Sequence, residues 1–407
     1  MVSVAEIKRA ASVLKGRIIR TPLVYSPTFS KLSGFKVYLK LENLQVTGSF
    51  KIRGAGFKIL AGANSIGPKG VVAASAGNHA QGVALASGWA GLAATIVMPE
   101  WASISKQEAT RGYGGQVILE GRNLSEAIAK ALELEKEGRA FIHPFDDPAI
   151  IAGQGTLGLE IMEELPDVDV IVVAVGGGGL ISGICLAARA KRPGVRIIGV
   201  QAQACPSALA ALEAGPDARV EPQSSIADGI AVRQIGSIPL DIIRRQVERI
   251  VLVGEDRIAE AVIMLLERKK VLAEGAGAVG AAALLGGLIE APPGSKVVLV
   301  VSGGNIDFSL LDRVIRKGLA WNGRIMRFGV KLDDEPGALA RLLVIITAKR
   351  ANILQIYHNR GGPDLPVRIS RVELEIETRN FAHIREIESA LGEAGYTLDP
   401  GAGSSYP

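Results

Sequence analysis

The strongest constraint on the fold is a regular alternation of two kinds of segment between Gly70 and Ile306. Continuous apolar runs, typical of strands buried on both faces, alternate with segments of helical composition. Strands are expected at Val71–Ala74, Ala93–Met98, Gln116–Leu119, Val170–Val175, Val195–Val200, Ile250–Val253 and Val297–Val301. Helices are expected at Asn78–Trp89, Ser103–Tyr113, Leu124–Glu137, Ala149–Glu164, Leu180–Arg192 and Asp256–Lys270. The alternation predicts an α/β fold with open parallel sheets.

Ligands of such sheets bind beyond the carboxyl ends of the strands, which directs attention to the loops after Ala74, Val175 and Val301. The first loop is Ser75-Ala76-Gly77-Asn78-His79. Asn78 could simply be the N-cap of the following helix. Alternatively, the backbone N–H groups of this loop could bind a carboxylate at the start of that helix. Both interpretations stay open at this point.

The second loop consists of four consecutive glycines, Gly176–Gly179. A tight strand-to-helix turn needs only one or two, and each further glycine costs conformational entropy on folding. Four in a row therefore favour a backbone that wraps an anion and aims its N–H groups at it. No Lys-Ser/Thr pair follows, so this is not a P-loop, and the spacing does not fit G-x-G-x-x-G. The third loop, Ser302-Gly303-Gly304-Asn305, would by itself be interpreted as a turn.

Lys51 is flanked by two apolar residues, Phe50 and Ile52. A lone lysine is usually a solvated surface charge. Apolar neighbours indicate partial burial, which would lower the pKa of the amine and make it a nucleophile.

The pattern changes after Gly318–Gly323. A strand over 324–332, a helix opened by Asp334-Glu335-Pro336-Gly337, strands at Ala351–Asn359 and Val372–Ile376, a helix at Phe381–Glu393 and a strand at Tyr396–Leu398 are expected. This βαββαβ order predicts a separate ferredoxin-like module.

Composition excludes several other classes of protein. The net charge of +5 is spread along 407 residues and aromatic residues make up only 4%, so nucleic acid is not an expected partner. The uncharged stretch Val170–Ala188 is long enough for a membrane span, but the glycines in it would break such a helix, so a membrane is not expected either. Two cysteines, Cys185 and Cys205, cannot form a disulfide framework, and the amphipathic N-terminal segment lacks the apolar block of a secretory signal. A cytoplasmic location is expected.

Together these motifs resemble those of the fold-type II pyridoxal-phosphate enzymes, and of the threonine dehydratase (threonine ammonia-lyase) family in particular. The resemblance covers about residues 5–318 and rests on Thr47–Ala55, Ser75–Gly82, Gly153–Thr156, Gly176–Leu180 and Ser302–Asn305. Residues 326–400, with Asp334–Leu339, resemble an ACT domain, a small amino-acid-sensing module.

The resemblance implies a two-lobed catalytic part like the tryptophan synthase β chain at 1–320, with a smaller lobe inserted at about 45–150. A linker at 321–326 and an ACT domain at 327–404 would follow. The implied cofactor is pyridoxal 5′-phosphate, and the implied reaction converts L-threonine to 2-oxobutanoate and ammonia, with L-serine as a secondary substrate. A homodimer or homotetramer, regulated by an amino-acid effector, is expected.

The resemblance also implies roles for individual residues. Lys51 would hold the cofactor covalently and, once released, remove the α-proton of the substrate. The remaining cofactor-binding residues would be Phe50, Asn78 (ring hydroxyl), Gly176, Gly177, Gly178, Gly179 and Leu180 (phosphate), and Ser302 (ring nitrogen). The substrate carboxylate would lie at Ser75, Ala76, Gly77 and His79. An effector would bind at Glu335, Pro336 and Gly337.

Three departures from related families narrow the expected activity. Serine racemases carry a second serine where this chain has Ala76, which argues against racemisation. The carboxylates with which those relatives bind a divalent cation are missing from Gly199–Cys205, so no metal is expected. Phe145 favours an apolar substrate pocket. The alternatives are another fold-type II activity (serine racemase, serine dehydratase or threonine synthase) and a catalytically inactive amino-acid-binding regulator.

Overall fold

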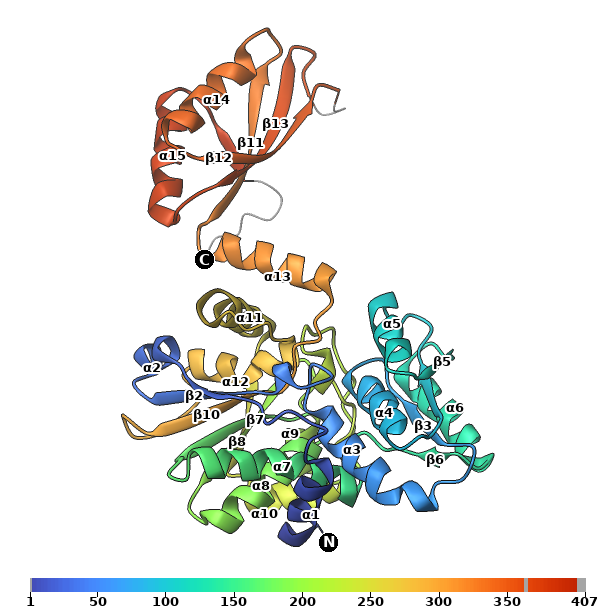
Figure 1. Cartoon of the computed structure of the whole chain (residues 1–407). Coiled ribbons are helices and arrows are strands. Elements are labelled where there is room, and N and C mark those ends of the chain that lie inside the picture. Colours follow the sequence, from blue (N-terminus) through green and yellow to red (C-terminus); the bar gives the residue numbers. More distant parts are fainter. Residues whose placement is uncertain (1, 362–364, 401–407) are drawn as a thin grey trace. The chain divides into compact units, whose positions relative to one another are not determined.

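The computed structural model describes residues 2–361 and 365–400. The chain divides into two compact units, Met1–Asp307 and Phe308–Pro407 (Figure 1). Helix α13 (Phe308–Trp321) groups with the second unit, whereas the motifs placed the end of the catalytic part at residue 320.

The first unit is built around a six-stranded sheet in the order β1-β2-β10-β7-β8-β9. Its strands are β1 (Leu23–Tyr25), β2 (Lys36–Leu41), β7 (Val170–Ala174), β8 (Arg196–Ala202), β9 (Arg249–Val253) and β10 (Lys296–Val301). All pairs are parallel except β1–β2. Strands β1 and β2 were not predicted, because the two lysines of β2 interrupt the apolar run that marks the other strands.

A second, four-stranded sheet is parallel throughout and has the order β5-β4-β3-β6. It consists of β3 (Val71–Ala74), β4 (Ala94–Met98), β5 (Gln116–Leu119) and the two-residue β6 (Ala140–Phe141). Helices α4 (Asn78–Trp89), α5 (Ile104–Gly112) and α6 (Leu124–Lys136) lie around it. The structure therefore has a small lobe inserted between strands of the large sheet, and the predicted parallel sheets are confirmed.

Helices cover both faces of the large sheet. Figure 1 shows α7 (Pro148–Glu164) and α8 (Gly179–Lys191) on one face and α12 (Gly275–Leu285) on the other. The remaining helices of this unit are α1 (Val4–Leu14), α2 (Pro27–Ser33), α3 (Lys51–Gly62), α9 (Ser207–Ala214), α10 (Ser237–Gln246) and α11 (Glu255–Lys269). Helix α12 was not predicted: it is almost entirely buried, so its sequence of glycine, alanine, valine and leucine has no polar face to reveal a helical period.

The Gly153–Thr156 motif lies inside α7 and lets neighbouring helices approach closely. A Cβ atom on Gly153 would come within 2.4 Å of the carbonyl oxygen of Arg53 in α3. A Cβ atom on Gly155 would come within 3.0 Å of the carbonyl oxygen of Gly183 in α8. These glycines therefore serve helix packing.

The second unit has the expected element order. Strands β11 (Ile325–Asp333), β12 (Asn352–Asn359), β13 (Ile369–Glu377) and β14 (Leu398–Pro400) form an antiparallel sheet in the order β12-β13-β11-β14, with helices α14 (Ala338–Ala348) and α15 (Phe381–Glu393). The last strand begins two residues later than predicted. Val372, Leu374 and Ile376 enter the core as the alternation predicts, but Glu375 is also buried, where it accepts a hydrogen bond from Arg327 at 2.6 Å.

Within the described residues, no helix is both long enough and apolar enough to cross a membrane. Cys185 and Cys205 are buried free thiols.

Candidate active site

Lys51 is the first residue of α3, a helix that packs against α4 of the small lobe and α7 of the large sheet. Its Nζ donates a hydrogen bond to the carbonyl oxygen of Pro144 at 2.9 Å and lies 5.3 Å from the centre of the Phe50 ring. Burial lowers the pKa of Lys51 to about 8, although the nearby Glu274 carboxylate opposes the shift. Near neutral pH, part of the Lys51 population is therefore the neutral amine, which is the nucleophilic form.

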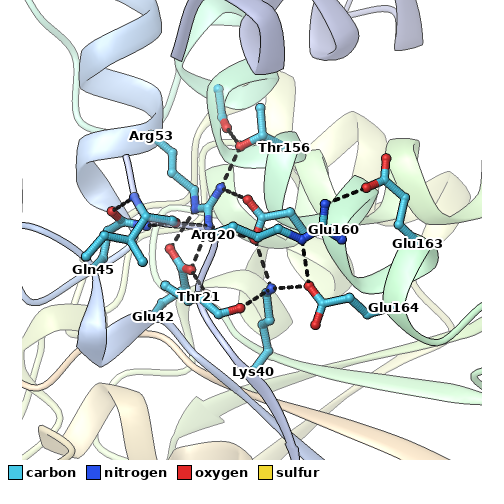
Figure 2. Close-up of polar contacts among 12 residues, drawn as sticks. Arg20, Thr21, Lys40, Glu42, Gln45, Arg53, Thr156, Glu160, Glu163 and Glu164 are labelled. Carbon is cyan, nitrogen blue, oxygen red and sulfur yellow. Dashed lines mark hydrogen bonds and ion pairs between the residues drawn. The ribbon is translucent and has the colours of Figure 1, made fainter. Parts of the chain in front are cut away.

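A buried ion-pair network anchors the start of this helix (Figure 2). Arg53 is fully buried and binds Glu42 through two hydrogen bonds of 2.7 and 2.8 Å. It also binds Glu160 of α7 at 2.6 and 3.0 Å and the Thr156 hydroxyl at 3.1 Å. Although burial acts in the opposite direction, Arg53 holds the pKa of Glu42 below its ordinary value. Paired hydrogen bonds of this kind fix the orientation of the guanidinium relative to the carboxylate as well as the distance between them.

Lys40 extends the network from β2. Its buried ammonium lies 2.8 Å from Glu160 and 3.1 Å from Glu164, and donates to the carbonyl oxygen of Thr21 at 2.6 Å. The Thr21 hydroxyl in turn donates to Glu42 at 2.5 Å. The network therefore ties β2, α3 and α7 together, and with them the position of the Lys51 backbone.

The loop before Lys51 pairs with the loop after β10. The N–H of Phe50 donates to the carbonyl oxygen of Ser302 at 3.1 Å, and Ser49 and Gly303 form an isolated antiparallel bridge. These contacts place Lys51 and Ser302 in one region, although some 250 residues separate them in the sequence. The buried Ser302 hydroxyl donates to the carbonyl oxygen of Ala276 at 3.3 Å.

Asn78 is not the N-cap of α4, so that interpretation of the loop is wrong. Gly77 holds the N-cap position, and Asn78 is the first helical residue. The Asn78 amide instead points at other loops: its Nδ2 donates to Glu274 at 2.7 Å and its Oδ1 accepts a hydrogen bond from Asn305 at 2.7 Å. Asn305 also donates to the carbonyl oxygen of Thr47 at 2.8 Å, so this amide pair joins three loops.

Glu274 is a buried carboxyl group at the start of α12. Its side chain borders Gly303, because a Cβ atom there would lie 2.4 Å from Glu274 Oε1. Burial, reinforced by the negative charge of Asp228, raises the pKa of Glu274 to about 7. Glu274 therefore changes charge close to neutral pH.

The four-glycine loop has the geometry of a backbone cradle. Gly178 has φ of 89° and caps α8, which begins at Gly179. A Cβ atom on Gly177 would lie 2.2 Å from the Phe145 ring, so no larger residue fits without displacing that side chain. The first N–H groups of α8 have no partner inside the helix and carry its positive dipole end. Since Phe145 follows Pro144, the carbonyl partner of Lys51, the cradle and the lysine belong to the same site.

The predicted carboxylate loop is present, but its side chains have local partners. The Ser75 hydroxyl accepts a hydrogen bond from the N–H of Gly77 at 3.2 Å. His79 is buried, and its Nε2 lies 2.9 Å from the carbonyl oxygen of Ile142. Burial, together with the charge of Lys51, lowers the pKa of His79 to about 3, so the ring is neutral. The backbone of this loop, Ala76 included, and the O–H of Ser75, whose bond to Gly77 uses the oxygen only as an acceptor, are therefore available to an anion, whereas the neutral His79 ring is not.

Lys106 links the small lobe to the large one. It lies on α5, and its Nζ is 2.8 Å from Asp228 and 3.7 Å from Asp307. With Gln81, Tyr113 and Asn305 it lines a cavity of about 480 Å³ beside the Asn78 amide.

A profile of pyridoxal-phosphate dependent enzymes matches residues 14–303. The chain belongs to this family. An L-threonine ammonia-lyase of Thermotoga maritima is 50% identical to this pyridoxal-phosphate dependent enzyme over 399 residues, which cover 98% of the chain and 99% of the relative. A catabolic L-threonine dehydratase of Escherichia coli is 45% identical over 315 residues, or 77% of this chain and 96% of that one. The solved structure of maize serine racemase has a TM-score of 0.72 and 34% identity, and the match covers 78% and 98% of the two chains.

Membership of this family makes pyridoxal 5′-phosphate the cofactor, and the first unit has the expected fold-type II architecture. The residues present fit such a group. The Gly176–Gly179 cradle and the first turn of α8 present N–H donors suited to a phosphate. The Ser49 hydroxyl, two residues from Lys51, is buried without a hydrogen-bond partner among the described residues, as expected for a group that faces a ligand.

Sequence reasoning missed three residues of this site: Glu274, Lys106 and Asn305, the last of which was noted in a motif but given no role. Glu274 had a usable signal, because it is the only charged residue between Lys270 and Glu290. A single acid inside an otherwise apolar segment is either paired or functional. Lys106 had no comparable signal, since its neighbourhood resembles a solvated helix face.

The predicted effector residues lie in the second unit. Glu335 pairs with Arg341 at 2.6 Å, and Gly337 caps α14 with φ of 88°. They form the turn between β11 and α14, as the sequence suggested.

Proposed function

We propose that this enzyme is a threonine ammonia-lyase, which converts L-threonine to 2-oxobutanoate and ammonia and acts secondarily on L-serine to give pyruvate. The observation that carries the proposal is the 50% identity to an L-threonine ammonia-lyase along nearly the whole of both chains. The candidate site supplies groups suited to an α,β-elimination of an amino acid: an amine of lowered pKa, an anion cradle and the hydrogen-bonded side chains of Asn78, Glu274 and Asn305.

Each predicted residue has a proposed task. Lys51 holds the cofactor covalently and, when freed by substrate, accepts the α-proton at Nζ. The N–H groups from Gly176 to Leu180 bind the phosphate, and Asn78 donates to the ring hydroxyl. When bound, pyridoxal 5′-phosphate supplies the electron sink that makes the α-proton acidic. Ser302, a neutral hydroxyl, faces the ring nitrogen, and Phe50 packs beside the lysine.

The carboxylate of the substrate would bind the N–H groups of the 75–79 loop at the start of α4. Because the His79 ring is turned onto Ile142 and is neutral, its side chain does not compete for that anion. Phe145 forms an apolar wall beside the glycine cradle, which suits the methyl group of threonine.

The second unit would act as an ACT-type regulatory domain that binds an amino-acid effector at Glu335, Pro336 and Gly337. Its strand order, β12-β13-β11-β14, together with a βαββαβ chain path, supports a ferredoxin-like module. The positive-φ turn at Gly337 presents the N–H groups at the start of α14. The proposal also includes a cytoplasmic location for the enzyme and its assembly as a homodimer or homotetramer.

Serine racemase is the main alternative, since the fold is shared with the maize enzyme. Ala76 disfavours it, because a methyl group cannot carry the second proton that racemisation needs. Threonine synthase and a catalytically inactive regulator are the others.

One experiment separates these functions. Purified protein loaded with pyridoxal phosphate is given L-threonine or L-serine, and 2-oxobutanoate, pyruvate and D-serine are measured. Faster formation of 2-oxobutanoate than of pyruvate supports the proposal. D-serine as the main product, or a requirement for a phosphorylated substrate, would overturn it. Lys51→Ala should abolish turnover and covalent cofactor attachment. A catalytically inactive regulator would show no absorption from a cofactor bound to the lysine, even in the wild type.

A further inference from the structure

The Asn78 amide is held by its neighbours on two sides. Its Nδ2 donates one hydrogen bond to Glu274 at 2.7 Å, and its Oδ1 accepts one from Asn305 at 2.7 Å. An amide has two N–H donors, so one remains beyond the bond to Glu274. Since the oxygen acceptor and the nitrogen donor are the two ends of the amide, the two contacts fix the nitrogen toward Glu274 and the oxygen toward Asn305.

Glu274 lies among charges from several elements. Asp228 in the 3-10 turn Asp228–Ile230 is negative, whereas Lys106 on α5 and Lys51 on α3 are positive. Lys106 is paired with Asp228 at 2.8 Å. Glu274 is 6% exposed, so its charge is screened little by water and depends on these neighbours.

We propose that Glu274 is a positioning residue: its ionised carboxylate holds the Asn78 amide so that the second N–H points to the ring hydroxyl of the bound cofactor. This rests on the proposed role of Asn78 and on the cofactor, but not on the identity of the substrate. Protonated Glu274 accepts the bond from Asn78 more weakly, because hydrogen bonds to a charged acceptor are stronger than those between neutral groups. Asn305 holds the other end in both states.

The consequence is a proton-dependent site. When Glu274 is ionised, Asn78 is fixed and the cofactor is held in one tilt. When Glu274 takes up a proton, Asn78 loosens, and turnover falls as the solution becomes acidic. The transition should lie near pH 7, where burial and Asp228 place the pKa of Glu274.

The test uses the full-length enzyme loaded with pyridoxal phosphate. The absorption spectrum of the bound cofactor, kcat and KM for L-threonine are measured between about pH 5.5 and 9 for the wild type, Glu274→Gln and Asp228→Asn. Glu260→Gln, on the exposed face of α11, is the matched control. In the wild type and the control, both spectrum and kcat should change around pH 7. Glu274→Gln should abolish that transition and lower kcat at pH 8 about tenfold, with KM changed less.

Asp228→Asn keeps the proposal testable if Glu274→Gln does not fold or load. Removing the negative charge of Asp228 stabilises ionised Glu274, and frees Lys106 to interact with it, so the midpoint should move to lower pH. A wild-type midpoint retained in Glu274→Gln, or unmoved or raised in Asp228→Asn, would overturn the inference. If instead the spectral transition depends on Glu274 but no 2-oxobutanoate forms, the inference stands and the proposed substrate is wrong.

Discussion

Lys51 and Glu274 carry opposite charges in one buried site, and burial moves both toward their neutral forms. The pKa of Lys51 falls to about 8 and that of Glu274 rises to about 7. The lowered pKa of Lys51 favours catalysis, because a neutral amine can attack as a nucleophile and can accept a proton. The raised pKa of Glu274 means that the free energy of unfolding is lower at neutral pH, because the folded protein must then bury an ionised carboxylate.

This loss of stability predicts a pH-dependent gain in stability for Glu274→Gln in the cofactor-free protein. A folded-state pKa raised from 4.5 to about 7 means that the contribution of Glu274 is fully favourable below about pH 4.5 and is lost as the pH rises through 7. The variant should therefore gain about 1–3 kcal/mol relative to the wild type between pH 5 and 8. Urea unfolding of both proteins at a series of pH values measures this gain. If the difference in unfolding free energy between variant and wild type does not change with pH, the raised pKa of Glu274 is contradicted.

At the scale of elements, the position of α3 depends on the Arg53 network more than on local sequence. Arg53→Met would leave Glu42 buried without its ion-pair partner, which should cost about 3–5 kcal/mol. Arg257→Met, which breaks an exposed pair with Glu260 on α11, is the matched control and should cost at most about 1 kcal/mol. Chemical unfolding compares the two. Equal losses would show that the network adds nothing beyond a surface pair.

The start of α8 predicts a second pair of variants. Gly177→Ala places a methyl group against the Phe145 ring and should weaken pyridoxal phosphate binding about tenfold or more. Gly88→Ala, in an open position of α4, should leave cofactor binding unchanged and stabilise the helix by up to about 1 kcal/mol. Cofactor titration of the apoenzymes is the measurement. Identical affinity in Gly177→Ala would exclude a close-fitting cradle.

At the scale of the whole molecule, every residue assigned to catalysis lies in the first unit, Met1–Asp307. The family match ends at residue 303, and the Escherichia coli dehydratase aligns with only 77% of the chain. A chain ending at Asp307 should therefore still deaminate threonine but lose any response to added amino acids such as the branched-chain ones. Circular dichroism checks that it folds, and a 2-oxobutanoate assay measures turnover. A fragment that folds and binds the cofactor but is inactive would contradict the assignment of catalysis to the first unit alone.

Local sequence patterns were enough to predict the strands and loops that frame the site. Val71–Ala74 has the predicted bounds and is buried throughout, because a buried parallel strand is a continuous apolar run that is easily recognised in a sequence. Gln116–Leu119 also has the predicted bounds, although it is a partly exposed strand at the edge of its sheet. The Gly176–Gly179 loop stood out because it has four consecutive glycines. Lys51 and Ser302 received their roles only from the resemblance of the combined motifs to a known family.

What sequence alone determined is therefore the α/β class, the order of the strands it predicted and the family. The residues nearest the cofactor remain a prediction from the resemblance. Tertiary structure decided which amide faces which acid. Asn78 meets Glu274 and Asn305, which follow it in the sequence by 196 and 227 residues, and Lys106 reaches Asp228 across the two lobes. Charge and pKa at such positions depend on burial and on distances of a few ångströms, which a linear pattern does not contain.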